Sequence, residues 1–125
     1  MGRRILVVDD EPQIRRILRI TLAAKGYEVL VAESGEDALV QMRSKKCDLM
    51  LLDINMPGIT GLELCRNLRG SSDRMEMTVV VMSTGEEHRA KALNAGADDY
   101  LSKPFGITQV FSCVESHLKL RDHRQ

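Results

Sequence analysis

The sequence predicts an α/β fold, a doubly wound five-stranded parallel sheet with five helices covering both faces. Four short apolar runs without polar alternation indicate strands that are buried on both sides. Segments of helical period separate these runs, and strands that alternate with helices join through right-handed crossovers into a parallel sheet. The four runs are Ile5–Val8, Val29–Val31, Leu49–Leu52 and Val79–Met82.

The first and last helices have the clearest apolar faces, and a shorter run completes the sheet. Residues that share one helical face recur twice along the chain: Ile14, Ile17, Leu18 and Leu22 near the N-terminus, and Val110, Val114 and Leu118 near the C-terminus. Tyr100–Leu101 predicts a fifth strand at an edge of the sheet. Helices therefore separate all five strands.

Helix boundaries carry local signals. Pro12 suits the first position of a helix, and capping boxes or close variants of them occupy Ser34–Asp37 and Thr60–Glu63. Three glycines stand where helices are expected to end: Gly26, Gly70 and Gly96.

One predicted helix is weaker than the others. The stretch 86–95 offers mainly Ala90, Leu93 and Ala95 to the core, so it buries little apolar area. Elements that move in switching come from the less stable parts of a structure. We therefore expect the segment 84–100 to be the moving part.

Length and composition indicate one domain, residues 1–125, with an ordinary apolar core. Lys plus Arg and Asp plus Glu number 18 each, so no overall charge favours direct binding of nucleic acid or of an anionic membrane. Three widely spaced cysteines, Cys47, Cys65 and Cys113, suggest reduced thiols rather than a zinc site. No apolar stretch approaches the roughly 20 residues that span a bilayer, and no signal peptide is evident, so we expect a cytoplasmic protein.

Polar residues follow the predicted strands at their carboxyl ends. In an open parallel sheet these ends form a common crevice where ligands bind. The groups in question are Asp9 and Asp10, Asp53, Ser83 and Thr84, and Lys103 with Pro104. Three neighbouring carboxylates repel one another unless a cation joins them, and Mg²⁺ binds through few carboxylates together with a phosphate oxygen. The pattern predicts a magnesium and phosphoryl site.

Each residue has a simpler interpretation when taken alone. Asp9 or Asp10 suits a helix cap, Asp53 a turn, and Lys103 a solvated surface charge. Four strand ends that each supply a fitting group favour the joint site. In that site Asp53 attacks phosphorus and becomes an acyl phosphate, while the metal and Lys103 neutralise the phosphoryl oxygens. The Ser83 hydroxyl is then free to turn toward the new acceptors.

The chain resembles the receiver domain of bacterial two-component response regulators. The resemblance covers nearly the whole chain and rests on four motifs that occur in order: Ile5–Pro12, Leu51–Gly61, Ser83 and Gly96–Phe105. It implies a flavodoxin-like sheet of order 2-1-3-4-5 and phosphoryl transfer to Asp53 from a histidine of a sensor kinase or a phosphotransfer protein. Such a domain catalyses only its own phosphorylation and dephosphorylation.

The resemblance also implies roles for individual residues. Asp10 and Asp53 would bind Mg²⁺ directly, Asp9 through water, and Asn55 through its backbone carbonyl. Lys103 would hold the phosphoryl group and form a cis peptide with Pro104.

For the output, Ser83 and Tyr100 would be the switch residues, with Tyr100 turning inward and reshaping the surface of the fourth helix, fifth strand and fifth helix. An effector domain, an output protein or a second copy of the chain would read that surface. Without the resemblance, Tyr100 reads as an edge-strand aromatic and Ser83 as a hydroxyl satisfied by backbone.

Thr84 departs from the small alanine of many receivers, and we expect it to narrow access to the acyl phosphate. Met56–Gly58 and Gly61 are expected to shape the loop after Asp53.

Three other functions compete with a receiver. A haloacid-dehalogenase-like Mg²⁺ phosphatase also uses a strand-end Asp, but it needs a second Asp where this chain has Asn55. A flavodoxin-type electron carrier shares the topology, but Asp9, Asp10 and Glu11 would repel a flavin phosphate. A docking module that works without phosphorylation would not need the complete site.

Overall fold

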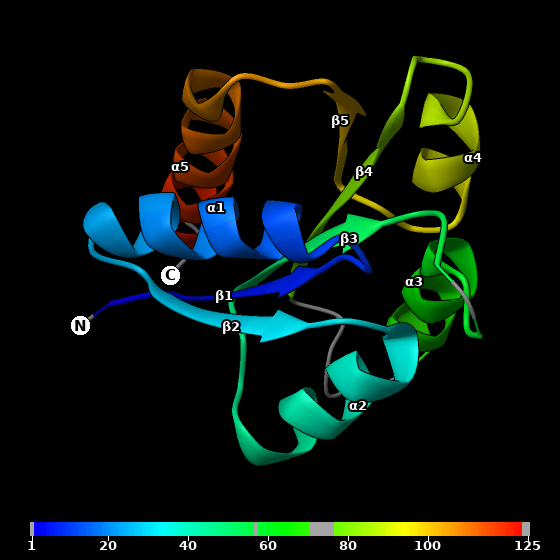
Figure 1. Cartoon of the computed structure of the whole chain (residues 1–125), viewed down its shortest axis with the longest axis horizontal. Helices are drawn as coiled ribbons and strands as arrows, with labels where there is room; N and C mark the ends of the chain where they lie inside the picture. The colour runs from blue at the N-terminus through cyan, green and yellow to red at the C-terminus, as the bar shows by residue number, and fades with distance from the viewer. Residues whose placement is uncertain (1, 57, 71–76, 124–125) are drawn as a thin grey trace.

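The computed structural model describes residues 2–56, 58–70 and 77–123. Strands and helices alternate through this part of the chain (Figure 1). In chain order they are β1 (Arg4–Val8), α1 (Pro12–Ala24), β2 (Glu28–Ala32), α2 (Gly35–Ser44), β3 (Leu49–Asp53), α3 (Gly61–Arg69), β4 (Thr78–Thr84), α4 (Arg89–Asn94), β5 (Asp99–Lys103) and α5 (Ile107–His123).

All five strands form one parallel sheet in the order β2-β1-β3-β4-β5. This confirms the predicted fold class and the predicted order, with the strand that contains Tyr100 at an edge. The order reverses direction between β1 and β3, which is where a parallel sheet opens its ligand crevice.

Alternate residues of each strand enter two separate hydrophobic layers. Leu6, Met50 and Val81 pack in the layer beneath α2, α3 and α4, whereas Val7 and Leu51 pack in the layer beneath α1 and α5. Figure 1 shows these two groups of helices on opposite faces of the sheet. Burial on both faces explains why the strands read as continuous apolar runs.

Two details of the predicted core are wrong. Ile17 is 47% exposed although its spacing matches the buried Leu18 and Leu22, because α1 buries only a narrow stripe. In α4 the buried residue is Ala92, while Leu93 is 45% exposed. Ala90 is also exposed, and of the three expected core residues only Ala95 is buried. The helix begins at Arg89, later than expected, and turns a different face inward.

The predicted capping signals are confirmed. Ser34 Oγ accepts a hydrogen bond from the backbone N–H of Asp37, and Thr60 forms a complete capping box with Glu63. These caps satisfy N–H groups that the first turn of a helix leaves unpaired. They fix where α2 and α3 begin.

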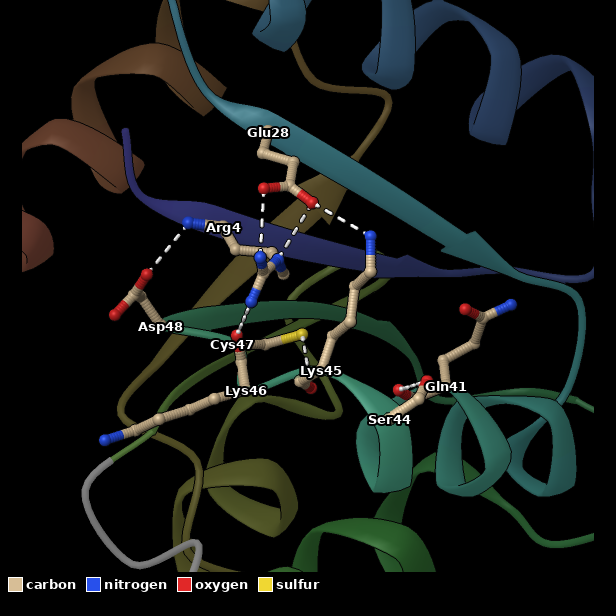
Figure 2. Close-up of polar contacts among 8 residues, drawn as sticks. All are labelled: Arg4, Glu28, Gln41, Ser44, Lys45, Lys46, Cys47 and Asp48. Carbon is tan, nitrogen blue, oxygen red and sulfur yellow. Dashed lines mark hydrogen bonds and ion pairs between the residues drawn. The ribbon is translucent and has the colours of Figure 1, made fainter. Parts of the chain in front are cut away.

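The edge formed by the amino ends of the strands is held by ion pairs (Figure 2). The Arg4 guanidinium contacts the Glu28 carboxylate at 3.0 Å and donates to the Lys46 carbonyl at 2.6 Å. The Arg4 backbone N–H donates to the Asp48 carboxylate at 2.8 Å. These contacts join β1 to β2 and to the loop before β3, so this edge is a structural one.

Within the described ranges, no helix has the length and apolar character that crossing a membrane requires.

Candidate functional site

The carboxyl ends of four adjacent strands converge at one edge of the sheet. Asp9 and Asp10 follow β1, Asp53 ends β3, and Thr84 ends β4 opposite Lys103 of β5. The order β1-β3-β4-β5 makes these strands consecutive neighbours. Side chains that are distant in sequence are therefore placed around one crevice, as the strand-end pattern predicts.

Three carboxylates form the acidic side of the crevice. Asp9, Asp10 and Asp53 each offer an oxygen atom within 4.8 Å of the others. Asp9 and Asp53 are buried, while Asp10 is exposed. Asp9 is oriented by the backbone N–H of Glu11, which donates to its Oδ1 at 2.9 Å. Asp53 Oδ1 accepts from the backbone N–H of Asn55 at 3.3 Å, so both buried carboxylates are held by the turns that follow their strands.

Lys103 brings the positive charge of the site. Its Nζ lies 2.9 Å from Asp9 Oδ2, 3.4 Å from Glu11 Oε1 and 3.8 Å from Asp53 Oδ1. The side chain is only 15% exposed. Burial by itself lowers the pKa of Lys103, but the hydrogen bond and charge of Asp9, helped by Asp53 and Glu11, outweigh burial and raise that pKa. Lys103 is therefore an ammonium ion.

Asp53 is destabilised as an anion. Burial is the main cause that raises its pKa to about 6, and the negative charge of Asp9 adds to the effect, while Lys103 acts against it. One ammonium group does not balance the carboxylates that face it. A divalent cation fits this donor set, because hard oxygen ligands are those that Mg²⁺ prefers.

A buried hydroxyl stands on β4 one residue after Met82, which pairs with Asp53 in the sheet. Ser83 is buried, and among the described residues its Oγ has no hydrogen-bond partner. An unpaired buried hydroxyl costs free energy, so this atom is available to accept or donate a further hydrogen bond. The neighbouring Thr84 is exposed at the mouth of the crevice.

Tyr100 points into the protein. It is buried, and its hydroxyl donates to the Gly85 carbonyl at 2.7 Å. Ser102 Oγ lies within hydrogen-bond distance of the same carbonyl, at 2.9 Å, and of the Glu86 carboxylate, and its one proton serves either acceptor. The Arg89 guanidinium pairs with Glu86 at 2.7 Å and lies 5.0 Å from the centre of the Tyr100 ring. Tyr100 therefore ties β5 to the loop between β4 and α4.

A pocket of about 340 Å³ opens beside the site. Its lining comes from α1 and its N-cap, the ends of β4 and β5, and the loop after β5: Glu11, Ile14, Thr84, Lys103, Pro104 and Phe105. The Lys103–Pro104 peptide bond is cis. Pro57, in the loop after Asp53, lies outside the described residues.

Sequence reasoning missed several partners of the site. Glu11 was not singled out as a partner of Lys103, although it directly follows the two aspartates. Gly85 and Arg89 contact Tyr100, and Ser102 shares the Gly85 carbonyl with it; all three contacts depend on how the β4–α4 loop folds back over β5. No local pattern in the sequence predicts the conformation of this loop.

The chain matches known proteins over most of its length. The family model for the response regulator receiver domain matches residues 5–115. Response regulator MprA of Mycobacterium tuberculosis is 40% identical over 119 residues, which make up 95% of this chain and 52% of the relative. The chain thus spans about half the length of the curated relatives it matches.

Solved structures share the fold. The response regulator protein TrrA of Thermotoga maritima, solved in complex with Mg²⁺ and BeF, aligns with a TM-score of 0.83 at 37% identity, covering 92% of this chain and 98% of that one. A CheY-like receiver domain protein of Methanospirillum hungatei aligns with a TM-score of 0.92 at 28% identity over 100% of both chains.

Proposed function

The chain belongs to the response regulator receiver family, and from this premise we propose that Asp53 accepts a phosphoryl group from a histidine of a sensor kinase or a phosphotransfer protein. The chain is a receiver domain of a two-component response regulator, and its acidic pocket suits a phosphorylation site. The match over residues 5–115 supports treating residues 1–125 as one domain.

The observation that carries the proposal is the position of Lys103. Its Nζ reaches both the buried Asp9 and Asp53, at 2.9 and 3.8 Å, from the end of a different strand. A metal and a lysine on the phosphoryl oxygens are the parts that phosphoryl transfer requires, because its catalysis is mainly positioning and charge neutralisation.

In the proposed reaction a carboxylate oxygen of Asp53 forms a bond to phosphorus as the bond from phosphorus to the histidine nitrogen breaks. The electron pair of the broken bond stays on the imidazole nitrogen, and one proton taken up from solvent makes the released histidine neutral. Lys103 moves toward the phosphoryl oxygens, and Ser83 Oγ, which has no partner among the described residues, donates to one of them.

Mg²⁺ is the proposed cofactor, held by Asp10 and Asp53 directly, by Asp9 through water, and by the backbone carbonyl of Asn55. The ion would neutralise charge on the phosphoryl oxygens during transfer. The clustering of the three carboxylates and the pKa of Asp53, raised to about 6, support a divalent cation at this place.

Thr84 and Tyr100 complete the proposed switch. Thr84, exposed beside Lys103 at the mouth of the crevice, would restrict access of water to the acyl phosphate. Tyr100 would report phosphorylation on the surface formed by α4, β5 and α5, since its hydroxyl already holds the loop that follows Ser83. An effector domain, a separate output protein or a second copy of the chain would read this surface.

We propose the cytoplasm as the location of the protein, because the three cysteines are free thiols, which suit a reducing compartment.

The test is the intact mass of the protein after incubation with acetyl phosphate, with and without Mg²⁺. The proposal predicts a gain of one phosphoryl group that requires Mg²⁺ and is lost in Asp53→Asn. Asp37→Asn is the matched control, because the Asp37 carboxylate accepts from the backbone N–H of Glu33 and is not part of the acidic cluster, so this variant should be labelled normally. No gain in wild type, or a gain that survives in Asp53→Asn, would contradict the assignment. Rapid turnover of unrelated phosphate esters would instead support the phosphatase.

A further inference from the structure

A second group of metal-binding side chains lies away from Asp53, where the start of β5 meets α5. Asp99 is the first residue of β5, and Cys113 and His117 are four residues apart on α5. Residues four apart lie on the same face of a helix, so both side chains approach Asp99 together. One ligand atom from each residue lies within 4.8 Å of the other two.

The spacing of these atoms suits a tetrahedral ion. His117 Nε2 lies 2.9 Å and Cys113 Sγ 3.5 Å from Asp99 Oδ2. Ligands bound tetrahedrally to zinc at about 2.0–2.3 Å are about 3.3–3.7 Å from one another. Two of the three spacings are therefore within a few tenths of an ångström of those in a tetrahedral site, and the third, between Cys113 and His117, is no more than 4.8 Å.

The carboxylate is oriented for this role. Asp99 Oδ1 accepts a hydrogen bond from the backbone N–H of Tyr100 at 2.8 Å, which directs Oδ2 toward Cys113 and His117. Partners of this kind, one shell beyond the metal, fix the geometry of metal ligands. The side chains of Asp99 and His117 are 39% and 20% exposed. A water molecule can therefore reach an ion held by the three side chains and act as its fourth ligand.

We propose that Asp99, Cys113 and His117 form a binding site for Zn²⁺, with water as the fourth ligand. One thiolate, one imidazole and one carboxylate are the donor types that zinc prefers, whereas the three carboxylates at Asp53 suit Mg²⁺. The two sites therefore select different metals. This inference does not depend on phosphorylation of Asp53.

Ionisation of the ligands is consistent with the site. Burial by itself raises the pKa of Asp99. Hydrogen bonds from His117, Tyr100 and Cys113 lower this pKa, and together they outweigh burial, so the carboxylate is charged. Burial, with the charge of Asp99, raises the pKa of the Cys113 thiol to about 12. Without metal the thiol donates to Asp99. When zinc binds, the S–H bond breaks, a Zn–S bond forms and the thiol proton passes to solvent. His117 gives up the proton on Nε2 to solvent and carries one on Nδ1 instead, so that Nε2 can bind the ion.

The competing interpretation is a purely structural cluster, in which Cys113 and His117 only donate hydrogen bonds to Asp99. In both interpretations the cluster holds β5 against α5. They differ in one property, the formation of a metal–thiolate bond, and that bond can be observed directly.

The first test is a titration of the protein with Co²⁺, a coloured substitute for zinc, in the presence of excess Mg²⁺. We expect a thiolate-to-cobalt charge-transfer band that Zn²⁺ abolishes, and that persists in Asp53→Asn. Cys113→Ser should lose the band, whereas Cys47→Ser, which alters a cysteine in the hydrophobic layer on the opposite face of the sheet, should retain it. Absence of the band in wild type, or its survival in Cys113→Ser, would overturn the proposal.

The second test keeps the thiol and removes the imidazole. His117→Gln should weaken Zn²⁺ binding by more than about tenfold in competition with a chromophoric chelator, with unchanged circular dichroism. Lys119→Gln, an exposed change on the same helix, should leave zinc affinity as in wild type. Equal affinity of His117→Gln and wild type would overturn the proposal, even if Cys113→Ser failed to fold.

Discussion

The Nζ of Lys103 lies 2.9 Å from the Oδ2 of Asp9, although 94 residues separate them in the sequence. This contact joins the end of β5 to the end of β1 across the two strands that lie between them. It places a positive charge where two buried carboxylates would otherwise repel each other. The proposed chemistry and the stability of the site both depend on it.

Replacing Lys103 should destabilise the protein, and Mg²⁺ should reverse part of the loss. Lys103→Met keeps most of the side-chain volume but leaves the buried Asp9 without its counter-ion, so we expect the free energy of unfolding to fall by about 1–3 kcal/mol. Urea denaturation with and without Mg²⁺ measures both effects. Lys119→Met, which removes an exposed ion pair with Glu115, should change stability by less than about 0.5 kcal/mol. Equal losses of stability in the two variants would show that the buried Lys103–Asp9 pair contributes no more than the exposed Lys119–Glu115 pair.

The pKa of Asp53 predicts how stability depends on pH without metal. This pKa is about 6 in the folded protein, against an ordinary value of 3.8 for an aspartate in the unfolded chain, so the folded state binds the extra proton between these values. Stability therefore falls as pH rises from about 4 to about 6. Asp53→Asn should lack this component and be more stable at pH 7 by about 1–2 kcal/mol. Urea denaturation over a pH series would contradict the prediction if both proteins followed the same curve.

Gly61 should be required for the position of Asp53. A Cβ at Gly61 would overlap the Asp53 carbonyl oxygen and lie 2.7 Å from Ile54 Cα, so the backbone at the end of β3 must move. We expect Gly61→Ala to lose about 1–3 kcal/mol of stability and to be phosphorylated more slowly. Gly70→Ala is the control, because a Cβ there is 3.6 Å from its nearest neighbour. Thermal unfolding and the rate of labelling by acetyl phosphate test the pair, and normal labelling of Gly61→Ala would refute the idea.

The Tyr100 hydroxyl should stabilise the loop between β4 and α4. Tyr100→Phe keeps the buried ring but removes the 2.7 Å bond to the Gly85 carbonyl, so we expect a loss of about 0.5–1.5 kcal/mol. Hydrogen exchange in residues 84–90 should become faster, while phosphorylation of Asp53 should continue. Tyr27→Phe, in the layer beneath α1 and α5, should leave exchange in this loop unchanged. Unchanged exchange in Tyr100→Phe as well would mean that this bond does not hold the loop.

Thr84 should set the lifetime of the acyl phosphate. It is exposed next to Lys103 at the mouth of the crevice, and truncation to alanine would admit water more freely. We expect Thr84→Ala to dephosphorylate severalfold faster than wild type, measured as loss of the phosphorylated mass with time. An unchanged rate would reject this role for Thr84.

The fold could be predicted from the sequence because each level of the pattern agrees with the others. Apolar runs such as Leu49–Leu52 have no polar alternation, and the structure buries both faces of that strand. Thr60 and Glu63 form the capping box that their spacing indicates. Asp53 and Lys103 share one crevice because both stand at the carboxyl ends of parallel strands, a position that the sequence pattern indicates.

The remaining features depend on tertiary contacts that have no local signal. The exposure of Leu93 follows from where α4 begins, which in turn depends on how the preceding loop packs over Tyr100. Cys113 and His117 have the spacing of one helical face, but Asp99, their third partner, is recognised only when α5 lies against β5. The sequence alone therefore indicates no more than an ordinary thiol at Cys113.

The central claim is that Asp53 itself carries the phosphoryl group, and chemical mapping tests it most directly. Borohydride reduces an aspartyl phosphate to homoserine, so the protein would be labelled with acetyl phosphate and Mg²⁺, reduced, digested and sequenced by tandem mass spectrometry. We predict homoserine at position 53 and unmodified aspartate at positions 9 and 10. Homoserine at position 9 or 10 instead, or a labelled protein with intact Asp53, would contradict the account.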